Sequence, residues 1–289
     1  METADFEYIR DLCHQRAAIV LDLEKSYLIE SRLQPLARTE GLGTIADLVA
    51  KMRTTGYGTL HGKVIEAMTT NETSFFRDLQ PFEALKKVIL PELIARRSLS
   101  RQLRIWCAAC STGQEPYTIA MLIEENFPQL AAWDVKILAT DLSTQVLERA
   151  RSGRFNQIEV NRGLPSPLVV KYFQRNGMQW ELCERVRNKV EFRQLNLIDA
   201  WPAINTMDIV FIRNVLIYFD VQTKKDILGK VRNKLRCDGY LFLGGAESTF
   251  SLDDSFVRTE VEKASIYRLK GYDDPVLPTR AVKAASVRA

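Results

Sequence analysis

Residues 103–116, LRIWCAACSTGQEP, combine an apolar run, a turn of small side chains and the start of a helix. The apolar run predicts a strand over residues 103–107, and a helix is predicted over residues 116–127. Small side chains at such a turn let a backbone approach a ligand closely, beside the free N–H groups of the helix N-terminus. A ligand site is one interpretation, and an ordinary strand-to-helix connection is the other. Gly113 is the one glycine in this stretch, so the turn departs from the G-x-G-x-x-G pattern of dinucleotide-binding folds.

The alternation of strand and helix continues to about residue 270. Further strands are predicted at residues 134–139, 207–212, 239–243 and 264–269, and further helices at residues 143–151 and 223–236. Strands that alternate with helices indicate an α/β fold, in which a doubly wound parallel sheet carries helices on both faces.

Residues 155–196 interrupt this alternation. Asn176-Gly177 is a hairpin signal, and residues 180–183 and 190–194 alternate like paired strands. We therefore predict a small antiparallel β-subdomain, inserted at about residues 165–195.

Helices are predicted before the α/β domain. Apolar residues recur at helical spacing through residues 1–75, which predicts a helical N-terminal domain. Pro81 opens a linker helix within residues 76–100, and the α/β domain then covers residues 101–270. Residues 271–289 have little apolar pattern and are expected to form a disordered tail.

Composition excludes several classes of protein. The 289 residues are 46% hydrophobic and 26% charged, with a net charge of +4, which is close to balance and does not favour nucleic-acid binding. No apolar run approaches the roughly 20 residues of a membrane span, and no signal peptide is visible, so we expect a cytoplasmic protein without membrane insertion. Five cysteines fit a reducing compartment, and two histidines disfavour histidine-based catalysis and a metal site.

An acid follows the second predicted strand of the α/β domain. Asp141 lies 28 residues after Gly113 (141 − 113), and at a strand end it could accept hydrogen bonds from ribose hydroxyls. This gap exceeds the about 20 residues of NAD-binding folds, which favours a different adenosine ligand. The alternative role for Asp141 is helix capping beside Ser143.

Other polar residues are predicted at strand ends or in the linker. Asn196 could contact an adenine edge or form an Asx turn, and Asn214 and Tyr218 are expected in the ligand crevice. In residues 70–78, an arginine could bind a carboxylate, although a helix cap followed by a solvated arginine is the alternative.

Taken together, these segments resemble the CheR family of bacterial chemotaxis receptor methyltransferases. The resemblance covers residues 5–270 and rests on TNETSFFR (70–77), STGQEPY (111–117), ATDLS (139–143), RNVLIYFD (213–220) and LGGAES (243–248). It implies a class I S-adenosylmethionine-dependent methyltransferase domain, Rossmann-like in fold, with an all-α N-terminal domain and a β-subdomain insertion. It also implies a protein-glutamate O-methyltransferase that forms S-adenosylhomocysteine as its product.

The resemblance further implies a set of cofactor-binding residues. Many members carry two consecutive acids where this chain has Gln114-Glu115, so the acidic contact is assigned to Glu115. Gly113, at the turn after the first predicted strand, is added as a cofactor-binding residue. The full set is Asn71, Thr73, Arg77, Gly113, Glu115, Asp141, Asn196, Leu197, Asn214 and Val215.

The implied chemistry does not need a general base. A glutamate carboxylate, with a reference pKa of about 4.3, is already ionised at neutral pH. Catalysis then depends on positioning and partial desolvation. Arg77 is the first candidate to orient the substrate carboxylate, and Tyr218 is the second.

The implied partners are the cytoplasmic helices of methyl-accepting chemotaxis receptors, which are acidic. Lys25 and Arg32 are seven residues apart, with Arg38 beyond them, and we expect a basic docking face there, although an ordinary solvated face is the alternative. The hairpin at Asn176-Gly177-Met178 is short for members that tether a receptor C-terminal peptide, which favours a tether-independent member. We expect a monomer.

Two alternatives stay open at this stage. One is a methyltransferase of another substrate class, because residues 214–218, NVLIY, loosely resemble the N-P-P-Y loop of amino-methyltransferases without its prolines. The other is a non-catalytic adaptor that binds the receptor and retains the fold.

Overall fold

The N-terminal domain is helical, as the sequence predicts. The computed structural model describes residues 1–272, except for the side chain of Lys25. The predicted tail, residues 271–289, lies outside this part from residue 273 onward. Buried Ile9, Leu33, Leu48 and Val64 belong to one core that all four α-helices share. These helices are α1 (Thr3–Ala17), α2 (Ser26–Thr39), α3 (Ile45–Thr54) and α4 (Thr59–Met68), with a 3-10 turn at Leu23–Lys25.

The linker helix begins at Gln80 and carries Pro81 in its first turn, where the missing N–H of proline is tolerated. It runs as α5 (Gln80–Ala84), a π-helical stretch (Leu85–Ile89) and α6 (Leu90–Arg96). The linker, residues 69–79, connects α4 to this helix and contains no helix or strand.

The α/β domain contains a seven-stranded sheet in the order β6-β2-β1-β7-β8-β10-β9. The first five strands in this order pair in parallel, and β10 is antiparallel to both of its neighbours. The order reverses between β1 and β7, which places a crevice at their carboxyl ends. The strands are β1 (Gln102–Ala108), β2 (Asp134–Asp141), β6 (Val190–Gln194), β7 (Met207–Ile212), β8 (Leu235–Leu243), β9 (Phe256–Val261) and β10 (Ala264–Leu269).

Helices cover both faces of this sheet. Along β1, Ile105 and Cys107 belong to one core, whereas Trp106 and Ala108 belong to the other, as the two-residue period of a strand requires. Side chains of α7 (Gln114–Asn126) and α8 (Thr144–Ser152) join the first core, and those of α12 (Val221–Lys234) join the second.

The insertion differs from its predicted extent. Its three-stranded antiparallel sheet, β3-β5-β4, begins at Arg154, and the predicted hairpin at Asn176-Gly177 joins β4 to β5. The expectation that residues 190–194 belong to the insertion is wrong, because β6 pairs in parallel with β2 at the edge of the large sheet. The elements of the insertion are β3 (Arg154–Asn156), α9 (Gln157–Asn161), α10 (Ser166–Tyr172), β4 (Phe173–Asn176), β5 (Gln179–Leu182) and α11 (Glu184–Arg187).

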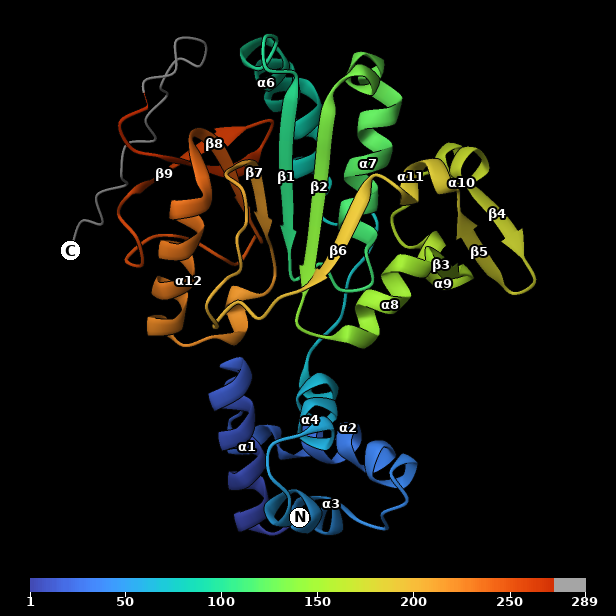
Figure 1. The fold of residues 1–289 in the computed structure, drawn as a ribbon, viewed down its shortest axis with the longest axis vertical. Coiled ribbons are helices and arrows are strands. Elements are labelled where there is room, and N and C mark those ends of the chain that lie inside the picture. The colour runs from blue at the N-terminus through green and yellow to red at the C-terminus, as the bar shows by residue number, and fades with distance from the viewer. Residues whose placement is uncertain (273–289) are drawn as a thin grey trace, which may run out of the picture.

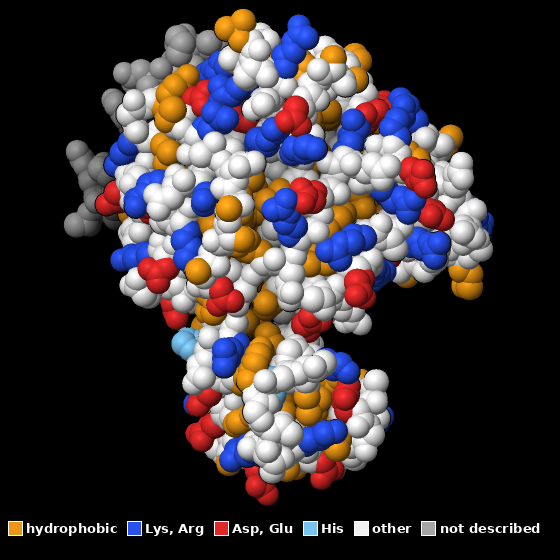
Figure 2. Space-filling model, in the orientation of Figure 1, with side chains coloured by type: hydrophobic (Ala, Val, Ile, Leu, Met, Phe, Trp, Pro, Cys, Tyr) orange, Lys and Arg blue, Asp and Glu red, His pale blue; other side chains and the backbone are white. Residues whose placement is uncertain are grey.

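The N-terminal domain lies below the carboxyl ends of β1 and β2 in Figure 1. The amide Nδ2 of Asn196 donates to the carbonyl of Arg16 (2.8 Å), and Glu66 accepts from the backbone N–H of Thr144 (2.9 Å). In Figure 2 the surface narrows between the two parts of the molecule, and hydrophobic side chains are visible there. Among the described helices, none combines the length and apolarity that a membrane crossing requires.

Candidate cofactor and active site

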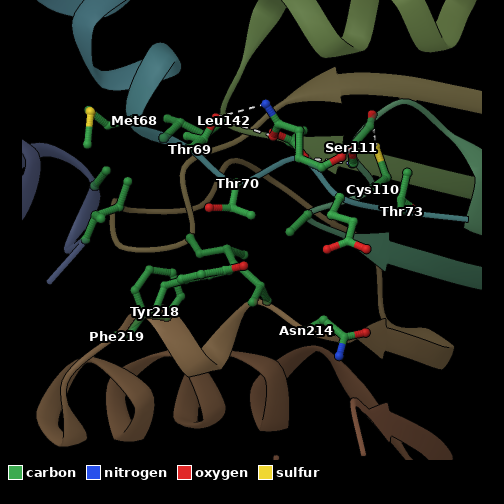
Figure 3. A pocket seen from close by; sticks show the side chains of 18 of the residues that line it. Met68, Thr69, Thr70, Thr73, Cys110, Ser111, Leu142, Asn214, Tyr218 and Phe219 are labelled. Atoms are coloured by element: carbon green, nitrogen blue, oxygen red, sulfur yellow. Dashed lines mark hydrogen bonds between the residues drawn. The ribbon is translucent and has the colours of Figure 1, made fainter. Parts of the chain in front are cut away.

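A pocket lies where the sheet order reverses. The carboxyl ends of β1, β2 and β7 form its base, and the linker and the N-terminal domain complete it. Figure 3 shows Cys110 and Ser111 on one side and Asn214, Tyr218 and Phe219 on the other. Predicted residues that line it are Asn71, Thr73, Arg77, Glu115, Asp141, Asn196, Leu197, Asn214, Val215 and Tyr218.

Gly113 is the exception among the predicted cofactor-binding residues. It stands outside the pocket lining, at φ +92°, and a Cβ there would come within 3.1 Å of both the Ala150 Cβ and the Tyr117 ring. The glycine therefore permits the tight turn between β1 and α7 and its packing on α8, and its direct cofactor contact stays a prediction. Gln114 also points away from the pocket, and its buried side chain accepts a hydrogen bond from Thr112 Oγ1 (2.8 Å).

Asp141 ends β2 with its carboxylate turned toward the turn after β1. Its Oδ2 accepts from the backbone N–H of Ser111 (2.8 Å), and its Oδ1 accepts from that of Ser143 (3.0 Å). Burial raises the pKa of Asp141, although these N–H groups oppose the shift. Ser143, rather than Asp141, is the N-cap of α8, because its side chain accepts from the backbone N–H of Val146.

Glu115 faces the same pocket from the first turn of α7. Its Oε2 accepts from Arg213 Nη1 (2.8 Å), and Arg213 Nη2 donates to Asp78 Oδ2 (2.9 Å) and to the carbonyl of Arg77 (2.9 Å). Burial raises the pKa of Glu115, and the positive charge of Arg213 opposes this shift. Arg213 thus joins α7, β7 and the linker at one point.

The linker forms the wall between the two domains. Arg77 Nη1 donates to the carbonyl of Glu72 (2.9 Å), which orients the arginine along the segment that also carries Asn71 and Thr73. Ser111 Oγ donates to the carbonyl of Asn71 (2.8 Å), and this bond ties the linker to the turn after β1.

The loop after β7 is held by a buried carboxylate. Glu247 accepts hydrogen bonds from the backbone N–H groups of Asn214 (2.8 Å), Val215 (2.9 Å), Leu216 (2.7 Å) and Gly244 (2.6 Å). Asn214 has φ +58°, a left-handed conformation that these bonds help to fix. The loop then leads into the short 3-10 helix Leu216–Tyr218, which brings Tyr218 to the pocket.

The three predicted docking residues do not form one face. Arg32 donates to the carbonyls of Met68 (2.7 Å) and Thr69 (3.2 Å) and lines the pocket, so it holds the start of the linker. Arg38 is exposed near the end of α2. Lys25 belongs to the 3-10 turn before α2, and its side chain lies outside the described residues.

Sequence reasoning assigned no role to Arg213, Glu247 or Asp78. A charged residue directly after the buried run 207–212 is a signal that would have identified Arg213. Glu247 and Asp78 have no comparable local signal, because their partners lie far away along the chain. The loop between α1 and α2 also contributes Ile19, Val20 and Leu21 to the pocket, and no pattern predicted this.

The fold and the site together define a class I S-adenosylmethionine-dependent methyltransferase. The defining features are the reversal of strand order between β1 and β7, the antiparallel β10, and an acid at the end of β2 in the resulting crevice. The buried carboxylates of Asp141 and Glu115 fit the hydroxyl and ammonium groups of such a cofactor.

Comparison with known families gives the more specific assignment. Residues 4–69 match the all-alpha domain of the CheR methyltransferases, and residues 71–265 match the SAM-binding domain of the same proteins. The chain therefore belongs to the CheR family, and it is a methyltransferase with S-adenosylmethionine as its cofactor.

Similar proteins match over most of their length. Chemotaxis protein methyltransferase 1 of Pseudomonas aeruginosa is 43% identical over 92% of this chain and 98% of its own. Chemotaxis protein methyltransferase Cher2 of Pseudomonas putida is 41% identical over the same shares of the two chains. A TehB-like SAM-dependent methyltransferase from Corynebacterium glutamicum covers 67% of this chain and 96% of its own, at 10% identity and a TM-score of 0.38, a likeness too low to add to the assignment.

Proposed function

We propose that this enzyme methylates the side-chain carboxylates of specific glutamates on the cytoplasmic helices of methyl-accepting chemotaxis receptors. S-adenosylhomocysteine is the second product. The observation that carries the proposal is the composition of the pocket. Asp141 and Glu115 lie on its strand-end side, and Arg77 and Tyr218 lie beside the linker and the loop after β7. The names of the similar chemotaxis methyltransferases support the receptor as substrate.

The pocket suits a carboxylate nucleophile. S-adenosylmethionine, when bound, supplies a methyl group on a positively charged sulfonium. A glutamate carboxylate is ionised at neutral pH, so the chain needs no residue to remove a proton. What remains for the protein is to align the carboxylate and to exclude water from it.

Arg77 is the residue proposed to align the substrate. Its hydrogen bond to the Glu72 carbonyl leaves donors for a carboxylate in the pocket. Tight pairing with arginine would make a carboxylate a weaker nucleophile, so the proposed role is orientation and not neutralisation. The Tyr218 hydroxyl is proposed to donate a second orienting hydrogen bond. Cofactor contacts are assigned to Asn71, Thr73, Arg77, Glu115, Asp141, Asn196, Leu197, Asn214 and Val215. The proposed contact of Gly113, at the turn after β1, is kept.

The receptor is proposed to dock on the basic residues of the α2 region. Arg38 is exposed there, and Lys25 precedes the helix, whereas Arg32 is committed to the linker carbonyls. We expect a Lys25→Glu/Arg38→Glu variant to raise KM for the receptor several-fold, whereas Lys51→Glu, at an exposed position of α3, leaves it unchanged. Equal KM values for the two variants would move the docking site elsewhere. The enzyme is proposed to act in the cytoplasm as a monomer.

The function is tested by transferring a radiolabelled methyl group from S-adenosylmethionine to purified receptor cytoplasmic fragments. We expect label that mild base releases as volatile methanol, because carboxyl methyl esters hydrolyse readily. Asp141→Ala is the negative control, because it removes a cofactor contact. Label that resists base would place the methyl group on nitrogen or another atom and contradict the proposal.

A further inference from the structure

The segment that carries Asn71, Thr73 and Arg77 has no hydrogen-bonded secondary structure of its own. Residues 71–74 belong to neither a helix nor a strand, and residues 75–78 form a turn. A segment of this kind takes its conformation from the surfaces on which it packs. One of these surfaces belongs to the inserted β-subdomain.

Phe75 anchors the segment against the insertion, in the core that the insertion shares with the large sheet. Its side chain is fully buried, and its ring makes edge-to-face contacts with Phe155 of β3 (5.0 Å between centroids) and with Phe173 of β4 (5.8 Å). Two residues beyond this anchor, Arg77 faces the pocket. The position of Arg77 is therefore tied to that of the insertion.

Gly163 brings the backbone of the insertion against the same residue. It lies between α9 and α10 with φ +88°, and a Cβ added to it would lie 2.1 Å from the carbonyl oxygen of Phe75. Backbone packs on backbone here, so a larger residue at position 163 has to displace residues 75–77 or itself.

Arg162 makes the third connection. Its guanidinium is paired with the carboxylate of Glu72, and the carbonyl of Glu72 accepts the hydrogen bond from Arg77 Nη1 (2.9 Å). A charge on the insertion is thus linked through one linker residue to the arginine that lines the pocket.

We propose that the β-subdomain supports the active site, and that Arg162 and Gly163 are positioning residues that act through the linker on Arg77. The orienting role of Arg77 rests on the function proposed above, whereas the link from the insertion to Arg77 does not. The insertion then affects cofactor binding and methyl transfer even when no partner touches it.

The test compares two glycines of the insertion. Gly163→Ala forces a Cβ onto the Phe75 carbonyl, whereas Gly177→Ala, at φ +60° in the hairpin, introduces similar backbone strain with nothing within 4 Å. We expect Gly163→Ala to weaken S-adenosylhomocysteine binding, measured by calorimetry, by about fivefold, and Gly177→Ala by less than about twofold. Equal affinities of the two variants would overturn the proposal.

A pair of arginines provides a test that leaves the backbone intact. Arg162→Ala removes the partner of Glu72, and Arg175→Ala removes a side chain whose Nε donates to the Gly177 carbonyl, away from the linker. We expect Arg162→Ala to lower affinity for S-adenosylhomocysteine by about twofold to fivefold, with Arg175→Ala matching the unchanged enzyme. No difference between Arg162→Ala and Arg175→Ala would remove Arg162 from the proposal.

A double-mutant cycle separates positioning from general destabilisation. If Gly163 acts through Arg77, the losses of affinity in Gly163→Ala and Arg77→Ala are less than additive when combined. Fully additive losses would contradict the proposal. These binding measurements need no receptor, so they remain valid even if the proposed receptor substrate is wrong. If the double-mutant cycle gives the expected result but no methyl group is transferred to the receptor, only the proposed substrate is contradicted.

Discussion

The two ends of the large sheet both bury carboxylates, but they treat them differently. At the carboxyl ends, burial raises the pKa of Glu115 and Asp141, and Asp141 is held by backbone N–H groups. Toward the amino ends, the side chain of Arg97 donates to Asp208 in β7 (2.8 Å) and to Asp238 in β8 (2.6 Å). At the carboxyl ends both carboxylates line the pocket, and only Glu115 is paired with an arginine, Arg213 (2.8 Å). At the amino ends one arginine, Arg97, binds both carboxylates away from the pocket.

This difference separates a binding site from a scaffold. A raised pKa means that the ionised carboxylate in the pocket is destabilised by burial. A ligand that brings positive charge or hydrogen-bond donors relieves this, and the gain in free energy favours its binding. Asp208 and Asp238, which are paired with Arg97 away from the pocket, have no such role, and their contribution is to the free energy of unfolding. The pKa of Asp238 illustrates this, because burial would raise it, yet the hydrogen bond and charge of Arg97 hold it below its ordinary value.

The largest expected effect is at the amino ends. Arg97→Ala leaves Asp208, which is 1% exposed, and Asp238 without their shared cation. We expect the free energy of unfolding at pH 7 to fall by about 3 kcal/mol, as measured by urea denaturation, while the remaining folded enzyme binds cofactor normally. Arg149→Ala is the control, because the pair of Arg149 with Glu159 is more exposed and is worth at most about 1 kcal/mol. Equal losses in these two variants would contradict the scaffold role.

The next effect is at the carboxyl end of β2. We expect Asp141→Ala to weaken S-adenosylhomocysteine binding by about 100-fold, because it removes a buried acceptor in the pocket. Asp134→Ala, at the other end of the same strand, should leave affinity unchanged. Calorimetric titration distinguishes the two, and a similar loss in both variants would break the contrast between the ends of the sheet.

A smaller effect is expected for the carboxylate behind the loop after β7. Glu247→Gln replaces an acceptor of four backbone N–H bonds by an amide that presents an N–H to one of them. We expect about tenfold weaker cofactor binding as the loop at Asn214 and Val215 loosens. Glu260→Gln, at an exposed position of β9, is the matched control. If Glu247→Gln lowers thermal stability without weakening cofactor binding, Glu247 belongs to the scaffold instead.

The smallest effect concerns pH and stability. Because the folded-state pKa of Asp238 lies below its ordinary value of 3.8, its pairing stabilises the protein above that pH and loses this contribution as the pH falls through the folded-state pKa. The difference in unfolding free energy between the unchanged enzyme and Asp238→Asn, about 1 kcal/mol at neutral pH, should therefore shrink in acid. A difference that stays constant down to pH 3 would show that the ionisation of Asp238 does not matter.

The sequence predicts the buried central strands of the fold, but not its short strands or the sheet that an edge strand joins. Buried parallel strands are continuous apolar runs, so β1, β2 and β7 and the polar residues at their ends were visible. β3 has three residues and was missed, and residues 190–194 alternate as an edge strand does, which led to their wrong placement in the insertion. Local patterns do not specify which sheet an edge strand joins.

The site was predictable where its residues follow strands and was not where distant segments meet. Asp141 and Asn214 are marked by the strand before them, whereas the bonds of Glu247 to Asn214 and of Arg213 to Asp78 cross more than 30 and 130 residues. Arg32 shows the same limit, because helical spacing indicated a shared face with Lys25, and the linker carbonyls that hold its guanidinium lie 36 and 37 residues away.

The carboxyl end of the sheet is proposed to bind the cofactor, while Arg77, on the linker, is proposed to align the carboxylate that receives the methyl group. The most direct test is to measure kcat/KM for receptor methylation and Kd for S-adenosylhomocysteine in Arg77→Ala. We expect kcat/KM to fall by about 100-fold and Kd to rise by less than about tenfold. Equal changes in the two quantities would show that Arg77 serves the cofactor alone and would contradict the claim.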